Sequence, residues 1–167
     1  RIGMKYVQEK FRINVAAQDV RTWGQTTNNL PDNAGLFSIQ EANAEILFNK
    51  HMTLKAGRQE IAYDEDRIFG TLDWSLQGRR HDAALLKYQD STWKADVGLA
   101  FNQDKEQNNT TIYSVPGHYK TFQFLYASKQ LKDLNLSLLI LNNGMQWTHL
   151  DSLGLIDDSG VRFSQTA

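Results

Sequence analysis

The sequence predicts an all-β protein whose strands run up and down in antiparallel order. The first observation is a period of two in residues 93–102, where Trp93, Val97 and Phe101 fall on one side and polar residues such as Lys94 on the other. Successive side chains of a strand point to opposite faces, so this segment lies between an apolar and a polar environment. The second observation is that such segments recur along the chain, and the third is the order of the connections between them.

Residues 81–102 form the clearest unit, an antiparallel hairpin with a very short turn at residues 90–92. Alternation of the same kind predicts about nine strands in all. In chain order these are Ile2–Val7, Phe11–Ala17 with an extension through Trp23, Phe37–Phe48, Thr53–Tyr63, the two strands of the hairpin, Tyr119–Lys129, Leu134–Leu141 and Val161–Ala167. Arg58 and Glu60 break the alternation, which indicates a bulge or the end of the apolar band near Gly57.

The connections follow a regular order. Short turns near 8–10, 49–52, 90–92 and 130–133 alternate with long polar loops near 24–36, 64–78, 103–118 and 142–160. Outer-membrane barrels have short periplasmic turns on one rim and long extracellular loops on the other, whereas soluble sandwiches show no such order. We therefore predict a single domain over residues 1–167, an antiparallel up-and-down transmembrane β-barrel.

The number of strands predicts that the chain is a portion of a larger barrel. Bacterial single-chain barrels have an even number of strands, and about nine are expected here. We expect at least one strand before Arg1 and further strands after Ala167. An open sheet edge in lipid would leave backbone N–H and C=O groups unpaired, at several kcal/mol each.

Composition excludes several classes of protein. With 167 residues, of which 41% are hydrophobic and 22% charged, the chain can bury a sizeable core. Its formal charge of −1 creates no field that would favour nucleic acid. The absence of cysteine excludes disulfides and thiolate metal sites. No apolar run reaches the roughly 18 residues of a transmembrane helix, but barrel strands of about 10 residues need no such run.

Several motifs stand in a fixed order along the chain. Residues 55–60 read KAGRQE, residues 64–67 read DEDR, and residues 72–83 read LDWSLQGRRHDA. Residues 17–24 (AQDVRTWG) and 139–144 (LILNNG) are further pieces. In this order and spacing they resemble the alginate export family of Gram-negative outer-membrane barrels, and the resemblance covers most of the chain.

The resemblance implies a wide monomeric barrel of about 18 strands, within the range of bacterial outer-membrane barrels. It also implies an arginine-rich lumen that passes an anionic uronate polysaccharide. The strands expected here would form about half of that barrel. At the level of single residues, the resemblance implies lumen positions for Arg58 and Arg67.

Alternation sorts the candidate contact residues into two sets, because the faces opposite the lipid-facing ones would line the lumen. The lipid-facing set is Val97, Leu99, Phe101, Phe122, Phe124, Leu136 and Leu138. The lumen or solute-contacting set, including residues near the rims and in loops, is Arg12, Lys55, Arg58, Arg67, Arg79, Arg80, Lys87 and Lys94. Aromatic residues near strand ends that suit a headgroup belt are Tyr6, Trp93, Tyr119 and Tyr126.

The cations of the lumen set have two interpretations. Arginine suits a carboxylate-bearing solute because its planar fork makes bidentate contacts. The alternative is a network of ion pairs that only stiffens the wall. Its acidic members would be Glu41, Glu45, Glu60, Asp82 and Asp96.

Neither a metal site nor a catalytic site is expected, and no cofactor is implied. The acidic run 64–66 lacks the spacing of a calcium loop, and the four histidines lack zinc-ligand spacing. Carboxylate pairs such as Glu41 and Glu45 carry no mark of a glycosidase. No nucleophile elbow or phosphate-binding glycine loop is present. We expect the protein not to be an enzyme.

The sequence therefore predicts a porin or export channel in the outer membrane of a Gram-negative bacterium, passing a hydrophilic, anionic solute such as a uronate polysaccharide or its oligomers. Its partners would be outer-membrane lipid and this solute, with any periplasmic or surface protein partner unknown and no nucleic acid. The alternative is a soluble or surface β-sandwich that binds carbohydrate on an aromatic face bearing Trp74, Trp93 and Trp147.

Overall fold

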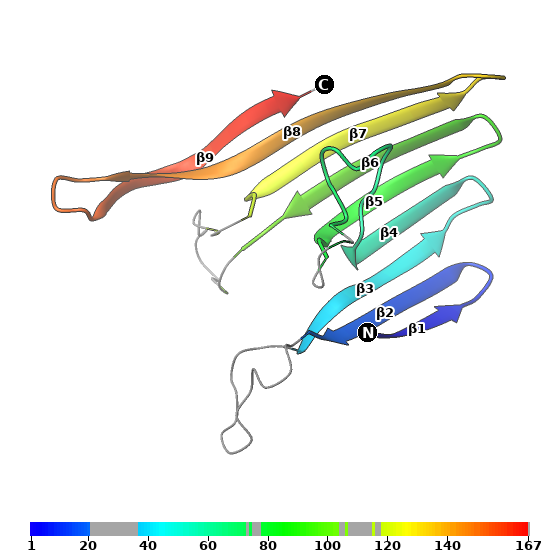
Figure 1. The fold of residues 1–167 in the computed structure, drawn as a ribbon, viewed down its shortest axis with the longest axis horizontal. Helices are drawn as coiled ribbons and strands as arrows, with labels where there is room; N and C mark the ends of the chain where they lie inside the picture. The colour runs from blue at the N-terminus through cyan, green and yellow to red at the C-terminus, as the bar shows by residue number, and fades with distance from the viewer. Residues whose placement is uncertain are drawn as a thin grey trace, which may run out of the picture.

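The computed structural model describes residues 1–20, 37–72, 74, 78–103, 106, 115 and 118–166. These residues form one antiparallel sheet of nine strands, in which each strand pairs with its neighbours in chain order (Figure 1). The strands are β1 (Ile2–Val7), β2 (Phe11–Asp19), β3 (Phe37–Leu47), β4 (Met52–Gln59), β5 (His81–Gln89), β6 (Trp93–Phe101), β7 (Thr121–Gln130), β8 (Asn135–Leu150) and β9 (Ile156–Thr166). The all-β, up-and-down prediction is confirmed.

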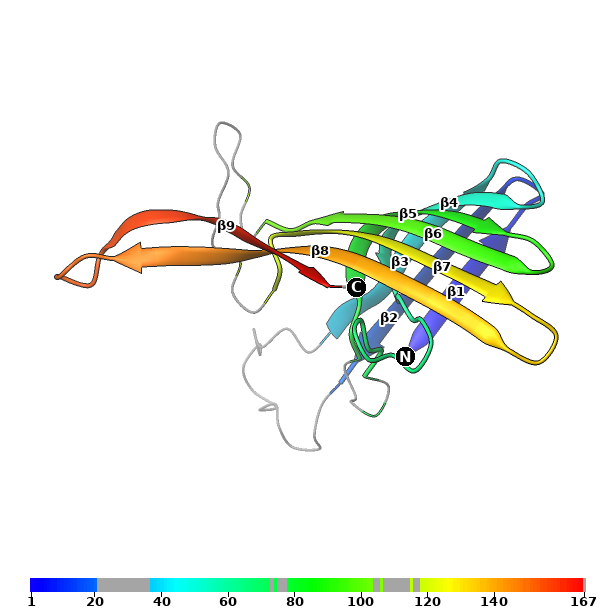
Figure 2. The same ribbon diagram turned by 90° about the horizontal axis from the view of Figure 1, so that it is seen from above.

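The sheet is curved and open. Figure 2 shows it bending around a concave side, with β1 and β9 at its two edges. An open, curved up-and-down sheet of this kind fits part of a larger barrel. A β-sandwich would require two sheets packed face to face, and the part of the chain described by the structure forms a single sheet. No helix in this part is long and apolar enough to cross a membrane.

The connections differ at the last hairpin from the order expected. Short connections join β1 to β2, β3 to β4, β5 to β6 and β7 to β8, and a long one, residues 60–80, joins β4 to β5. The expected loop at 24–36 lies outside the described residues, as does most of the loop at 103–118. The expected loop at 142–160 is wrong, because β8 continues to Leu150 and residues 151–155 alone separate it from β9.

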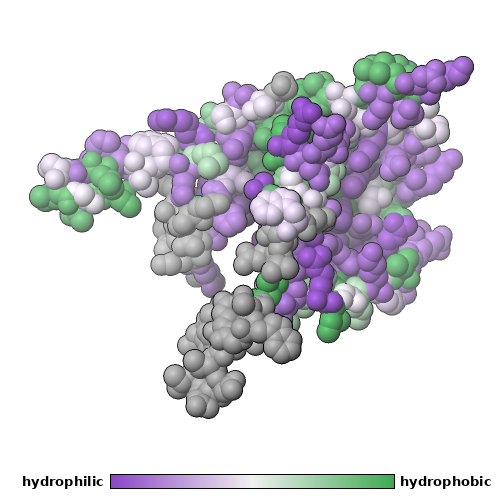
Figure 3. Space-filling model, viewed as in Figure 1, coloured by the Kyte–Doolittle hydropathy of each residue, from purple (hydrophilic) through white to green (hydrophobic). Residues whose placement is uncertain are grey.

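Much of the expected loop forms strand because strand pairing depends on hydrogen bonds of the backbone and not on the polarity of the side chains. Beyond Gly144, which pairs with the first residue of β7, the polar end of β8 has β9 as its partner. The two strands project as a ribbon past the rest of the sheet (Figure 1). Its tip exposes Leu150, Leu153, Leu155 and Ile156, and the projecting end of the molecule shows hydrophobic surface in green in Figure 3.

The two faces of the sheet have opposite character. We call the face that bears Val97, Leu99 and Phe101 the outer face, because these residues are exposed and apolar. The opposite, concave face is the inner face, and it bears Lys87 and Asp96, which pair across β5 and β6. The face seen in Figure 3 is mainly hydrophilic across the strands.

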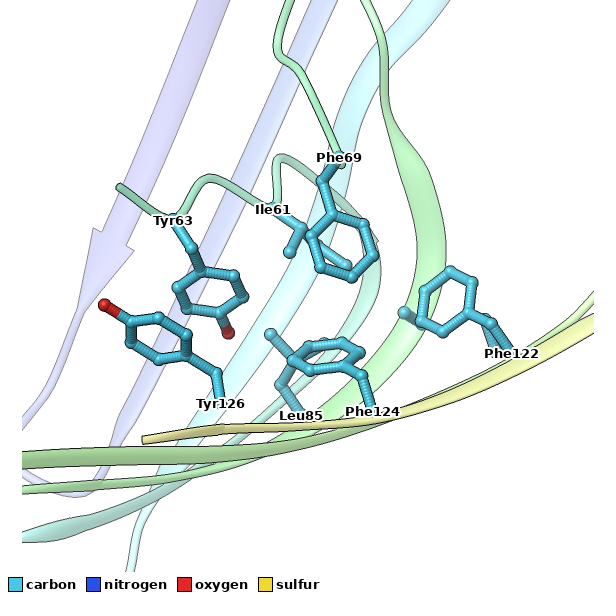
Figure 4. Packing of buried hydrophobic residues seen from close by; sticks show 9 residues of the cluster. Ile61, Tyr63, Phe69, Leu85, Phe122, Phe124 and Tyr126 are labelled. Carbon is cyan, nitrogen blue, oxygen red and sulfur yellow. The ribbon is translucent and has the colours of Figure 1, made fainter. Parts of the chain in front are cut away.

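A segment of the β4–β5 connection covers part of the inner face. We call residues 61–72 the strap. Ile61, Tyr63 and Phe69 of the strap are buried in one hydrophobic cluster with wall residues. The wall residues of this cluster that Figure 4 labels are Leu85, Phe122, Phe124 and Tyr126. This cluster is the hydrophobic core of the described chain.

The lipid-facing prediction for Phe122 and Phe124 is wrong. Their side chains are 2% and 4% exposed, and they pair with Ala100 and Gly98 of the inner face. Only glycine fits at position 98, because a Cβ there would lie 1.9 Å from the Phe124 ring. Alternation groups these aromatic residues correctly, but it does not show that a distant segment covers their face.

Candidate functional site

Ion pairs cross the inner face from strand to strand. Arg12 of β2 and Lys55 of β4 both approach Glu45 of β3, with N–O distances of 3.5 Å and 3.9 Å. Lys87 of β5 lies 3.6 Å from Asp96 of β6. Each of these pairs consists of residues directly opposite in the antiparallel register, where opposite charges attract. Three of the expected lumen cations therefore have carboxylate partners.

Two arginines of the β4–β5 connection are also paired. Arg80 is held in the structure, because its side chain is only 6% exposed and lies 3.7 Å from Glu41 and 3.2 Å from Glu60. Arg67 lies 2.6 Å from Glu65, and both side chains are largely exposed. An exposed pair of this kind contributes little to stability, about 0–1 kcal/mol.

Arg58 lies on the opposite face from the one expected. In the register it lies opposite Ala42 of β3 and Asp82 of β5. It is separated from Leu54 by an even number of residues, so it lies on the same face as the Leu54–Leu86 pair, which is the outer face. Its side chain nevertheless lines the cavity at the rim of the sheet that is described below, so the lumen assignment of Arg58 stays a prediction. Its guanidinium donates two hydrogen bonds to the Asp82 carboxylate, at 2.9 Å and 2.7 Å. Since the register on both sides of Gly57 is unbroken, the broken alternation marks the end of the apolar band.

Three hydrogen bonds fasten the strap to the sheet. The Tyr63 hydroxyl donates to Asp96 Oδ2 at 2.7 Å, and Asp64 accepts hydrogen bonds from Tyr126 and Ser137, both at 2.9 Å. Burial, and then the charge of Asp96, raise the pKa of Tyr63. The Tyr63 hydroxyl therefore stays protonated and acts as a donor. The headgroup-belt expectation for Tyr126 is wrong, since this residue is buried beneath the strap.

Lys94 and Arg79 are placed by the strap instead of by carboxylates. The Lys94 ammonium lies 5.0 Å from the ring centroid of Tyr63 and 5.4 Å from that of Tyr126, and the two rings are stacked at 4.0 Å. Arg79 donates through Nη1 to the carbonyl oxygen of Phe69 at 3.0 Å. Neither forms an ion pair within the described part of the chain.

A cavity of about 1000 Å³ opens where the long connections leave the sheet. Its lining includes Gln40, Arg79, His118 and Tyr119. Burial raises the pKa of Tyr119 to about 12, and its hydroxyl lies 2.9 Å from His81 Nδ1. Tyr119 is thus part of this polar cavity and not of a lipid belt. Sequence alternation cannot find such a site, because it is closed by residues from distant segments.

The remaining candidate residues lie on the outer face. Val97, Leu99, Phe101, Leu136 and Leu138 are exposed there. Tyr6 and Trp93 are exposed near the short turns, and Lys129 lies 4.8 Å from the Trp93 ring centroid. The three tryptophans of the carbohydrate-binding alternative come from a connection and from two different strands. Among the described residues, no group of three or more His, Asp or Glu could hold a metal ion.

Comparison with models of protein families gives a match. The model of a protein family described as alginate export matches residues 2–129. This range includes β1 to β6, the strap and most of β7. No curated protein and no solved structure matches the chain.

Proposed function

The chain belongs to the alginate export family, and on this premise we propose that it forms part of the wall of an outer-membrane channel that passes a hydrophilic, anionic solute. A uronate polysaccharide or its oligomers would fit this description. The family is one of transporters and not of enzymes. The proposed setting is the outer membrane of a Gram-negative bacterium, with membrane lipid and the solute as partners and no nucleic acid.

The observation that carries the proposal is the contrast between the two faces. The outer face exposes apolar side chains along β6 and β8, whereas the inner face carries paired charges and the polar cavity. A strand of nine residues is about 30 Å long at about 3.3 Å per residue. Tilted by about 40°, it would span about 23 Å of the roughly 25 Å apolar band of such barrels.

The interior fits a polar solute with carboxylate groups. Several cations lie on the inner face or at its rim, and the cavity offers a guanidinium beside side-chain amides. Arginine binds carboxylates through two parallel hydrogen bonds, which favours this class of anion. The strap narrows the space in front of β5 to β8, so passage would run beside it.

Fractionation of the native protein that contains this chain tests the proposal. We expect it in the outer-membrane fraction, with a gel mobility that changes when the sample is boiled in detergent. After reconstitution in planar lipid bilayers it should conduct ions and be blocked by short uronate oligomers. A protein found in the soluble fraction, with no conductance, would contradict the channel.

A further inference from the structure

A row of side-chain amides crosses the outer face of the sheet. Gln123 of β7, Asn142 of β8 and Gln165 of β9 lie directly opposite one another in the register, and we call these three residues the amide row. Gln123 also lies opposite Leu99 of β6, which is exposed on the outer face. Polar groups therefore interrupt the face that is otherwise suited to lipid.

Hydrogen bonds link the amides from strand to strand. Gln165 Nε2 donates to Asn142 Oδ1 at 3.0 Å, and Asn142 Nδ2 donates to Gln123 Oε1 at 2.7 Å. Gln123 Nε2 donates to the Thr121 hydroxyl at 2.8 Å. That hydroxyl donates in turn to the carbonyl oxygen of Ala100 at 2.8 Å. The chain of bonds extends from β9 to β6 and holds the amides side by side.

The amide row keeps hydrogen-bonding capacity that the sheet does not use. Each amide has two N–H donors and an oxygen with two lone pairs, and each uses one N–H within the row. The second N–H of each amide, and the oxygen of Gln165, have no partner in the described part of the chain. Gln123 and Asn142 are half-buried and Gln165 is exposed, so a neighbouring molecule can reach them.

The position of the amide row along β7 places it inside the apolar layer. At the short-turn end of this strand Lys129 lies opposite Trp93, a residue that suits the headgroup level. Gln123 precedes Lys129 by six residues, which is about 20 Å along the strand. At a tilt of about 40° this spans about 15 Å of the roughly 25 Å apolar band. An N–H group without a partner at this depth is costly.

The unused groups select among the lipids that could cover them. Phospholipids with ester-linked chains offer only hydrogen-bond acceptors where the chains begin. Chains that are joined by amide bonds and carry hydroxyl groups offer donors and acceptors, which match the free N–H groups and oxygen of the row. Leu125 and Ile140 lie opposite each other in the next outward-facing pair and are exposed, so an acyl chain can pack beside the row.

We propose that the amide row binds a glycolipid of the outer leaflet through the amide bonds and hydroxyl groups at the roots of its acyl chains. The row lies nearer to the long connections than to the short turns, and long connections face the cell exterior in such barrels. The inference rests on the membrane setting of the proposed function and does not depend on the solute that the channel passes. The lipid supplies partners for amides that would otherwise face hydrocarbon.

The test uses the native protein in detergent micelles and measures bound lipid by native mass spectrometry with two probes, lipid A and cardiolipin. Both carry two phosphates and several acyl chains, but the chains of cardiolipin are joined by esters and bear no hydroxyl groups. Gln123→Leu and Asn142→Leu should each weaken binding of lipid A about fivefold, as for the loss of one neutral hydrogen bond. Binding of cardiolipin should not change.

The double variant Gln123→Leu/Asn142→Leu keeps the test valid if a single change disturbs folding, because removing both partners of a hydrogen bond can be nearly neutral for stability. It should lose at least as much affinity for lipid A as either single variant. The matched control is Gln130→Leu, which removes an exposed amide at the other end of β7 and should bind both lipids as the wild type does.

Equal affinity of the wild type and the double variant for lipid A would overturn the site while the channel stands. Equal losses for both lipids would also overturn it, because phosphate or apolar contacts would then explain binding. A wild-type dimer that the double variant does not form would assign the row to a contact between two copies instead. A wild-type protein that is absent from the outer membrane would contradict the proposed function.

Discussion

The Tyr63 hydroxyl donates a 2.7 Å hydrogen bond to Asp96 Oδ2 and thereby joins the strap to β6. Asp96 is 0% exposed, and its other contact is with Lys87 at 3.6 Å. A buried carboxylate needs such partners, because burying a charge without them is costly. This contact therefore helps to decide whether the strap stays on the inner face.

Replacing Tyr63 by Phe tests this role. The ring remains to stack on Tyr126, but Asp96 loses its donor, and we expect the free energy of unfolding to fall by about 1–3 kcal/mol. Protease cleavage within residues 61–72 should also become faster. The matched control is Tyr88→Phe, which removes an exposed bond to Asp90 at 2.9 Å and should have little effect. Equal stability of both variants would show that the Tyr63–Asp96 hydrogen bond does not hold the strap on the sheet.

Substituting Val97 by Arg tests the outer face. Val97 lies in the middle of β6 among exposed apolar residues, and an arginine at the bilayer midplane should cost about 2–4 kcal/mol or prevent insertion. Folding into lipid vesicles, followed by the heat-dependent gel shift, measures this cost. Gln89→Arg, on the inner face of β5 by its pairing with Lys94, should fold normally. Normal assembly of the Val97 variant would contradict lipid contact at this face.

Changing Lys94 to Glu tests selectivity. The ammonium lies over two tyrosine rings and has no carboxylate partner in the described chain, so its charge is available to a passing anion. We expect folding to be retained and the reversal potential in a salt gradient to show a lower preference for anions. Lys129→Glu makes the same change of charge beside Trp93, on the outer face, and should leave selectivity unchanged. An unaltered reversal potential for Lys94→Glu would assign this lysine to wall structure.

Asp90 makes the β5–β6 turn sensitive to acid. Hydrogen bonds from the backbone of Thr92 and then Trp93 lower its pKa to about 2, below the value of about 3.9 for an unfolded aspartate. Because the pKa of Asp90 is lower in the folded state, its ionised carboxylate stabilises the fold in full at pH values above its unfolded pKa. This stabilisation is lost as the pH falls through about 2. The stability difference between wild type and Asp90→Ala should therefore shrink from pH 5 to pH 2. A difference that does not depend on pH would show that the charge of Asp90 is irrelevant.

Much of the fold could be predicted because its signal is local. Alternation within β6 separates Val97, Leu99 and Phe101 from Asp96, and no distant residue is needed for this. The alternative interpretation of the cations, pairing with wall carboxylates, also followed from charges that alternate on facing strands. The structure contains that network for Arg12, Lys55 and Lys87.

The candidate site could be predicted only in part, because it is assembled from segments far apart in the chain. Nothing near Phe122 and Phe124 indicates that Ile61, Tyr63 and Phe69 will cover them. The pairing of Arg80 with Glu41 likewise joins residues on different elements. Nothing in the sequence indicates that Gln40 and Asn143 line the cavity, since an isolated amide in a strand is compatible with either face.

The sequence by itself determined the strands, their alternation and the family motifs, because these depend on neighbouring residues and on the period of the backbone. Only the tertiary structure decided which aromatic residues face inward, how far β8 extends, and which cations are left without carboxylates. These features depend on where the strap and the rim connections come to lie. The physical reason is that burial and ion pairing are properties of contacts between segments and are not encoded in either segment alone.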